Sequence, residues 1–189
     1  MSRTTGASLI RGSKRAVLTE GQRRYLESIP DEKRTVIVPC SQELALAAQH
    51  LIEEIRAVAP GLPILFLGAA ALGIPGQVDI DVYVLSPPAD WANRATKLER
   101  VLGPAIRQGT SIRWEGTRDG YRVDLYLSDP AAPSFQEQVT IFEILRQNPT
   151  LRDEYARLKQ EARGRSFREY QRRKYEFYNR VLGRDEPER

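Results

Sequence analysis

Two patterns of apolar and polar residues follow each other along the chain. Up to residue 127, short apolar runs bounded by turn residues alternate with stretches in which apolar residues recur at helical spacing. The short runs are typical of strands, and the longer stretches are typical of amphipathic helices. The sequence therefore predicts extended segments at 36–38, 64–67, 78–85, 111–115 and 121–127. It predicts helices at 19–28, 41–58 and 90–106, and one helical turn at 69–72.

From Phe135 onward the pattern is helical, with breaks at Asn148-Pro149 and at Gly164. Proline suits the first turn of a new helix, and the run from Ser166 to Glu169 matches a capping box. Early strands and late helices predict an α+β fold, a small mixed β-sheet backed by helices with a C-terminal helical extension. We expect four regions: a flexible basic arm (1–18), an α/β core (19–132), a helical extension packed on the core (133–184) and a tail (185–189).

Two strands carry particular expectations. The run at 64–67 is apolar throughout, which is typical of a fully buried strand. The strands at 111–115 and 121–127 are joined by Asp119-Gly120, a strong hairpin signal. In the second arm the alternation places Asp124 on the face opposite its apolar residues. The hairpin therefore presents one apolar face and one polar face.

Two acidic residues interrupt the apolar strand at 78–85. Asp79 and Asp81 flank Ile80, so both carboxylates project to one face while the apolar residues project to the other. Carboxylates held side by side repel each other, and a proton or a cation relieves this repulsion. Mg²⁺ is a hard cation that binds carboxylate oxygens together with substrate phosphates. The pair is a candidate metal site; the alternative is a strand end whose acids are solvated.

Asp124 adds a third acid with the same phase. If the two acidic strands are neighbours, three carboxylates converge and can hold paired metal ions, which clamp the attacking and leaving oxygens of a phosphoryl transfer. The alternative for Asp124 is a cross-strand ion pair with Arg113. Arg122 is expected to face away from Asp124 into solvent. Gly68 would allow the backbone to approach a triphosphate closely, unless it only forms a strand-to-helix turn.

The composition lacks the residues that several other kinds of functional site require. Cys40 and His50 are the single cysteine and the single histidine, so an internal disulfide, a Cys/His zinc site and a Ser-His-Asp triad are excluded. No apolar run approaches the ~20 residues of a membrane span, and the basic N-terminal segment lacks the apolar core of a secretory signal. We therefore expect a cytoplasmic protein with no membrane partner. The net charge of +4 suits nucleotides or nucleic acid.

The order of these features resembles the nucleotidyltransferase superfamily of polymerase-beta type. An apolar strand ends at Gly68, the Asp79-Ile80-Asp81 triplet follows, and Asp124 lies on a later strand. The resemblance implies that Asp79 and Asp81 are paired metal ligands and Asp124 the third acid. It also implies that Gly68-Ala69 replaces the Gly-Ser phosphate motif, with Ala69 lacking the hydroxyl. The implied cofactor is Mg²⁺, as one or two ions, and the implied substrate is a nucleoside triphosphate.

The carboxy-terminal part is similar to the GrpB family. The resembling stretch is FEILRQNPTLRDEYARLK at 142–159, and Tyr170, Lys174 and the apolar residues up to Leu182 follow where that family has its last helix. The resemblance covers about residues 41–182 and implies a minimal nucleotidyltransferase fold. That family usually carries a lysine between the glycine and the first acid, whereas residues 69–77 are uncharged. Lys174, or Lys159, is expected to supply the missing cation to the triphosphate.

We therefore expect a Mg²⁺-dependent nucleotidyltransferase that transfers a nucleotide to an unknown acceptor hydroxyl. A catalytically inactive relative that binds a nucleotide or a partner is the first alternative, favoured by Ala69 and the uncharged loop. A basic RNA-binding module is the second. Its candidate residues are the basic set of the tail and the interleaved tyrosines: Arg163, Arg165, Arg168, Arg172, Arg173, Lys174, Arg180, Tyr170, Tyr175 and Tyr178. Acids mixed into this set are typical of solvated helices, so nucleic acid is retained as a partner but not favoured.

Overall fold

Five strands form one mixed sheet in the order β1-β2-β5-β4-β3. The computed structural model describes residues 17–184. The strands are β1 (Ile64–Leu67), β2 (Asp79–Leu85), β3 (Arg107–Gln108), β4 (Ser111–Arg118) and β5 (Tyr121–Ser128). Only β2 and β5 are parallel neighbours, while the other pairs are antiparallel. The two strands that carry the acids are therefore adjacent at the centre of the sheet.

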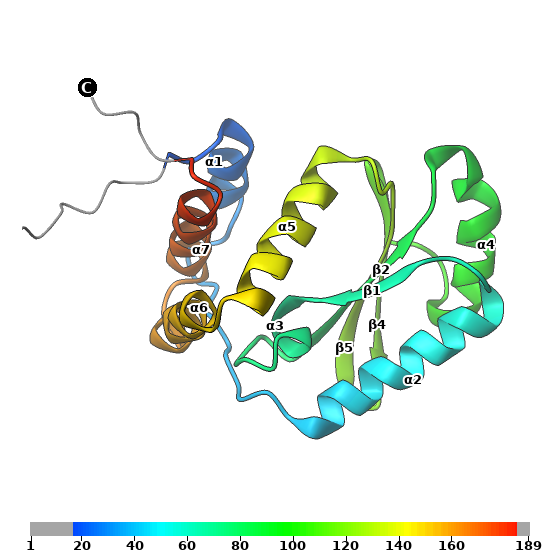
Figure 1. Cartoon of the computed structure of the whole chain (residues 1–189), viewed down its shortest axis with the longest axis horizontal. Helices are drawn as coiled ribbons and strands as arrows, with labels where there is room; N and C mark the ends of the chain where they lie inside the picture. Colours follow the sequence, from blue (N-terminus) through cyan, green and yellow to red (C-terminus); the bar gives the residue numbers. More distant parts are fainter. Residues whose placement is uncertain (1–16, 185–189) are drawn as a thin grey trace, which may run out of the picture.

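Helices cover both faces of this sheet (Figure 1). In chain order they are α1 (Glu20–Glu27), α2 (Gln42–Val58), α3 (Gly68–Ala71), the 3-10 turn η1 (Pro88–Asp90), α4 (Trp91–Leu102), α5 (Pro133–Gln147), α6 (Pro149–Ala162) and α7 (Phe167–Val181). Helices α2 and α4 pack on one face, and α5 packs on the other. The mixed sheet backed by helices, with a helical extension, is confirmed.

The face against α2 and α4 holds the main hydrophobic core. Its fully buried strand residues are the ones that alternation assigns to this side: Ile80, Val82, Val84, Val123, Leu125 and Leu127. They pack against Leu51 and Ile55 of α2, Leu98 of α4 and Trp114 of β4. Because side chains alternate along a strand, burying this set directs Asp79, Asp81 and Asp124 to the opposite face. The core therefore determines which way the acids project.

The opposite face is covered only over part of its width. Phe135 of α5 packs on Tyr83 with ring centroids 5.6 Å apart, and Tyr83 stacks on Tyr126 at 4.7 Å. Gln138 of α5 donates a hydrogen bond to the Tyr83 hydroxyl at 2.7 Å. These contacts hold α5 over β2 and β5, next to the acids.

The last two helices form a separate layer together with the first one. Helix α6 packs on α7, and α1 packs on α7 through Leu26, Ile29 and Tyr170. Thr19 caps α1 through a capping box with Gln22. Helix α1 therefore lies with the extension in space, although the expected boundaries grouped residues 19–132 as one core. The expected arm and tail lie outside the described residues, apart from residues 17 and 18.

Local signals located most helix ends correctly. Ser41 caps α2 by accepting from the Leu44 amide at 3.2 Å, and Asn148 caps α6 by accepting from the Leu151 amide at 3.1 Å. Ser166 caps α7 by accepting from the Glu169 amide. Gly164 lies between α6 and α7, as expected. These signals act over three or four residues, and the sequence displays them directly.

Four expectations about individual segments were wrong. Strand β1 is an edge strand with only Leu67 buried, so the apolar run is not a fully buried strand. Helix α4 ends at Leu102 before Gly103 and Pro104, which leaves Ile106 outside it and 55% exposed. Strand β4 continues beyond Glu115 to Arg118. Residues 36–38 form no strand, because only Val38 makes an isolated bridge, with Gly76.

No helix within residues 17–184 combines the length and the apolar character that crossing a membrane requires.

Candidate metal and nucleotide site

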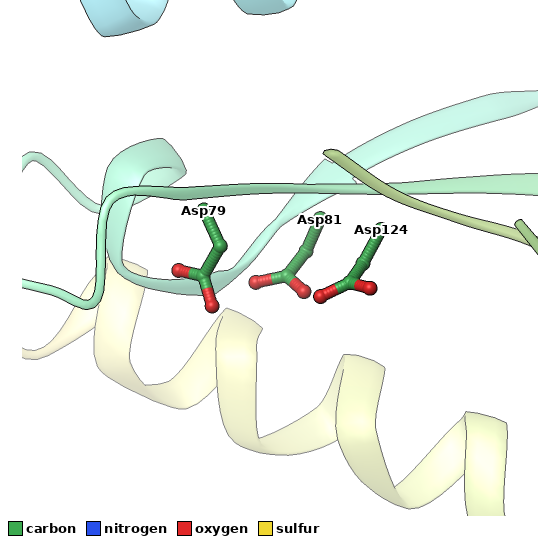
Figure 2. A group of neighbouring side chains, drawn as sticks. All are labelled: Asp79, Asp81 and Asp124. Atoms are coloured by element: carbon green, nitrogen blue, oxygen red, sulfur yellow. The ribbon is translucent and has the colours of Figure 1, made fainter. Parts of the chain in front are cut away.

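Three carboxylates meet on the α5 side of the sheet. Asp81 on β2 lies directly beside Asp124 on the parallel strand β5, and Asp79 lies two residues before Asp81. One oxygen from each carboxylate lies within 4.8 Å of the others. Figure 2 shows the three side chains in a row, all projecting from the strands toward the same helix. The structure thus brings together the three acids that the sequence singled out.

The crowding changes the acidity of the central residue. Burial, followed by the negative charges of Asp79 and Asp124, raises the pKa of Asp81 from 3.8 to about 7. Lys174 and Lys159 act in the opposite direction but do not cancel this effect. A bound cation would remove the repulsion that raises the pKa. Oxygen donors alone, in this number and this close, are the ligand set that Mg²⁺ accepts.

A glycine is required beside Asp81 for two reasons. Gly68 has a φ of 81°, a backbone region that L side chains rarely adopt. A Cβ built on Gly68 would lie 2.3 Å from Asp81 Oδ2. The strand-to-helix turn at Gly68 therefore comes into direct contact with the acid cluster. This contact unites the two interpretations left open for Gly68, since the turn is also part of the site.

Ala69 follows in a different setting. It is 7% exposed, and its Cβ lies 2.6 Å from the position that a Cβ on Gly76 would occupy. It packs with Ile74, with Ile141 of α5 and with Phe177 of α7. The alanine thus links the 69–77 loop to the helical layer while still lining the cavity described next.

A cavity of about 600 Å³ extends from the acid cluster to the helical extension. Gly68, Asp79 and Asp81 line one end of it, and the other end is lined by residues from α6 and α7. The α6 and α7 residues are Tyr155, Lys159, Tyr170, Lys174, Tyr175 and Tyr178. The volume falls within the roughly 300–1,000 Å³ of small-molecule and cofactor sites. The cavity therefore has an acidic end and a basic, aromatic end.

Lys159 dominates the basic end and is itself 5% exposed. Its ammonium donates to the Tyr170 hydroxyl at 3.1 Å and lies 5.0 Å from the centre of the Tyr155 ring. The Tyr155 and Tyr178 hydroxyls lie 2.8 Å apart. Within residues 17–184, Lys159 has no carboxylate at ion-pair distance. A buried ammonium without a carboxylate is costly, so an anion entering the cavity would be attracted to it.

Lys174 joins Lys159 from the next helix. Burial opposes its charge, yet the hydroxyl oxygens of Tyr178, Tyr170 and Tyr175 and the carboxylate of Asp81 raise the pKa of Lys174. Tyr170 is buried, which opposes its ionisation, but Lys159 and Lys174 lower its pKa. These shifts reflect a positive local field.

The tyrosines around these lysines were not predicted as part of the site. The sequence does contain a pattern that could have indicated them. Tyrosines lie four residues from a lysine at 155 and 159, and again at 170, 174 and 178, which places them on one helix face.

Asp124 makes the ion pair with Arg113 and also belongs to the acid cluster. Arg113 Nη2 donates to Asp124 Oδ1 at 2.6 Å. Arg122 Nη2 lies 3.2 Å from Asp124 Oδ2, so the expectation that Arg122 faces away was wrong. Residues two apart on a strand share a face, which brings the two side chains together. Glu115 completes the group, 2.6 Å from Arg113 and 3.2 Å from Arg122.

The basic residues of the tail mostly have acidic partners within the protein. The ion pairs of α7 are Arg168 with Asp31, Arg172 with Glu169 and Glu176, Arg173 with Glu161, and Arg180 with Glu154. Charges neutralised in this way attract phosphate backbones weakly. The pattern supports solvated helical faces over an RNA-binding surface.

One solved structure gives the fold independent support. The crystal structure of the conserved protein GrpB from Enterococcus faecalis matches with a TM-score of 0.58 and 9% identity, over 78% of this chain and 99% of that one. Two structures of the poly(U) polymerase and RNA terminal uridylyl transferase Cid1 match with TM-scores of 0.42, at 11% and 13% identity. Each of these two matches covers 74% of this chain and about half of the Cid1 chain.

The family assignment comes from the sequence itself. No curated protein matches the chain. The family model described as GrpB protein matches residues 35–184, which include the whole sheet, the acid cluster and both lysines of the cavity. The chain therefore belongs to the GrpB family.

Proposed function

We propose that the protein is a Mg²⁺-dependent nucleotidyltransferase acting on a nucleoside triphosphate and an acceptor hydroxyl. The observation that carries the proposal is the cavity lined by Asp79 and Asp81 on one side and by Lys159 and Lys174 on the other, with Asp124 clustered beside the two acids. A nucleoside triphosphate complexed with Mg²⁺ has the matching charges, because the cation suits the acids and the phosphates suit the lysines.

The acids fit a divalent cation by their chemistry. All three donors are carboxylate oxygens within 4.8 Å of one another, and burial together with the two neighbouring acids raises the pKa of the central one, Asp81. One or two bound ions would neutralise charge that develops on the transferred phosphoryl group. Asp79 and Asp81 would hold the metal over the triphosphate, and Asp124 would orient the acceptor hydroxyl and take its proton.

The chain supplies the phosphate contacts from two sides. Gly68 allows the backbone to come close, and the uncharged loop at 69–77 offers amides but no cation. Lys159 and Lys174 enter from α6 and α7 and replace the missing cation. Catalysis on this plan is mostly positioning and charge neutralisation.

A catalytically inactive nucleotide-binding protein is the second candidate. Ala69 favours it, because the side chain at this position packs against the loop at Gly76 and offers no hydroxyl to a phosphate. Retention of the three clustered acids, with two lysines lining the adjoining cavity, favours the enzyme. Both candidates bind a nucleoside triphosphate with Mg²⁺, but only the enzyme releases pyrophosphate from it.

Thermal unfolding with each of the four ribonucleoside triphosphates, with and without Mg²⁺, tests the proposal. At a ligand concentration 100-fold above Kd, binding to the native state adds about 2.7 kcal/mol, which raises the Tm by roughly 5–10 °C. We expect this rise only with Mg²⁺, and we expect Asp81→Asn to abolish it. Released pyrophosphate, measured with a panel of hydroxyl acceptors, reports turnover.

Asp119→Asn is the matched control. Asp119 lies at the hairpin turn, half exposed and paired with His50, and asparagine suits the same turn. This variant should bind as the wild type does. Stabilisation that is the same without Mg²⁺, or the same in Asp81→Asn, would contradict the proposal. Metal-dependent stabilisation without pyrophosphate release would favour the inactive candidate.

A further inference from the structure

Two arginines contact Asp124: Arg113 from β4, on the side away from Asp81, and Arg122 from β5, beside Asp79. Strand β4 lies on the other side of β5 from β2, and it contributes Arg113 and Glu115 to the face that carries the acids. Arg122 lies on β5 itself, two residues before Asp124. The Asp124 side chain is 6% exposed, whereas those of Arg113 and Arg122 are 22% and 54% exposed. The arginines thus form the accessible rim above a buried acid.

Each guanidinium has N–H donors that make no contact with the two acids. Arg113 uses the single nitrogen Nη2 for both Asp124 and Glu115, and Arg122 also uses Nη2 for both acids. Within residues 17–184, neither Nη1 has a protein acceptor. A guanidinium presents its donors as a planar fork that matches two oxygens of a phosphate. Each guanidinium therefore has an Nη1 group that is not used by a protein acceptor.

Metal binding at the acids would change the charge balance of this rim. In the present arrangement, two arginines face two carboxylates, Glu115 and Asp124. A cation that engages Asp124 competes with the arginines for its oxygens, which leaves two positive groups sharing the carboxylate of Glu115. A surplus of positive charge then arises beside the third acid.

We propose that Arg113 and Arg122 form the acceptor subsite, and that the acceptor carries a phosphate group close to its reacting hydroxyl. This inference rests on the nucleotidyltransferase function proposed above. The acceptor oxygen forms a bond to the α-phosphorus while the bond from that phosphorus to the bridging oxygen breaks. Pyrophosphate leaves with that electron pair, and the hydroxyl proton passes to Asp124. The arginines hold the phosphate of the acceptor so that its hydroxyl lies against Asp124.

The test uses protein loaded with Mg²⁺ and the α,β-methylene analogue of whichever nucleoside triphosphate stabilises it. Isothermal titration then follows the binding of two probes, glycerol 3-phosphate for a small phosphomonoester and the dinucleotide UpU for an RNA end. Glycerol serves as the probe without phosphate. We expect one phosphate probe to bind and glycerol not to bind. Arg122→Gln and Arg113→Gln should each weaken that binding by about tenfold or more, the loss of a charge-assisted contact.

Arg118→Gln is the matched control, because Arg118 lies on the same hairpin but pairs with Glu54 of α2 on the opposite face. It removes the same charge and should leave probe binding unchanged. The inference is overturned if neither probe binds to the loaded protein, or if Arg122→Gln binds as tightly as Arg118→Gln. It is also overturned if Arg113→Gln weakens Mg²⁺ binding alone, since the arginines then only position Asp124. Failure of the Mg²⁺–nucleotide to bind at all defeats the proposed function itself.

Discussion

At the scale of single residues, the site depends on how closely the backbone approaches one carboxylate. Gly68 lies against Asp81 so tightly that no side chain fits between them. The turn and the acid are therefore parts of one feature, although twelve positions, 69–80, separate them in the sequence. A substitution at residue 68 should therefore affect metal and nucleotide binding more strongly than the stability of the fold.

Gly68→Ala should weaken Mg²⁺-dependent nucleotide binding by about tenfold or more, because the new methyl group displaces Asp81 Oδ2. It should also lower the free energy of unfolding by about 1–2 kcal/mol, the cost of a left-handed conformation for an L residue. Nucleotide titration and denaturant unfolding measure the two effects separately.

Gly73→Ala separates strain from displacement. Gly73 has a φ of 67°, and a Cβ there meets nothing within 4 Å. This variant should lose similar stability and keep its nucleotide affinity. Equal affinity loss in both variants would show that loop strain, and not contact with Asp81, controls binding.

At the scale of secondary-structure elements, the pairing of α6 with α7 creates the basic end of the cavity. Lys159 comes from α6, and its hydroxyl partner Tyr170 and the second cation Lys174 come from α7. The ammonium of Lys159 is buried against rings without a carboxylate partner among residues 17–184. A buried ammonium of this kind can bind an anionic ligand strongly, but it lowers the stability of the ligand-free fold.

Lys159→Met should therefore leave the protein as stable as the wild type, or raise the free energy of unfolding by about 1 kcal/mol, since a buried charge is replaced by an apolar chain of similar length. Nucleoside triphosphate affinity should fall by roughly tenfold or more as a charged contact is lost. Nucleoside affinity, measured without phosphates, should not change.

Lys97→Met is the control for removing one positive charge. Lys97 lies on α4, which packs on the other face of the sheet. It should leave both affinities unchanged. A large loss of stability in Lys159→Met would instead assign Lys159 a structural role.

At the scale of the whole molecule, folding brings like charges together before any cation is bound. Burial and the neighbouring acids raise the pKa of Asp81 from 3.8 to about 7. A raised pKa means that the folded state favours the protonated acid. Its stabilising effect is full below about pH 4 and is lost as the pH rises to about 7.

The free energy of unfolding of the metal-free protein should therefore fall between about pH 4 and pH 7. The full effect for this shift is on the order of 4 kcal/mol. Asp81→Asn should flatten the slope and raise the Tm at pH 8. Mg²⁺ should restore stability in the wild type at pH 8 by binding the native state alone. Denaturant unfolding across this pH range, with EDTA or with Mg²⁺, measures each effect.

The acids with a lowered pKa give the opposite slope in a different window. Glu143, Glu161 and Glu169 are paired with arginines that lower their pKa below 4.5. Their stabilising contribution is lost only as the pH falls through that lowered range. A flat stability curve from about pH 4 to pH 7 in the metal-free wild type would contradict the burial and crowding of Asp81.

Much of the local structure could be predicted because it depends on neighbours in sequence. The capping box at Ser166, the start of a new helix at Pro149 and the turn at Asp119-Gly120 were all visible as patterns. What failed depends on distant partners. The edge position of β1 comes from strand order, and the Arg113 contact of Asp124 comes from the pairing of β4 with β5. The Arg122 contact is the exception, because it follows from alternation along β5 itself.

The sequence alone determined that Asp79 and Asp81 share a face, since side chains alternate along any strand. It also determined that the apolar residues between and after them point to the core. Only the tertiary structure decided that Asp124 lies beside Asp81, because the parallel pairing of β2 with β5 joins segments forty residues apart. It also placed Lys159 and Lys174 opposite the acids, since helix docking depends on the contacts of the whole core and not on any local pattern.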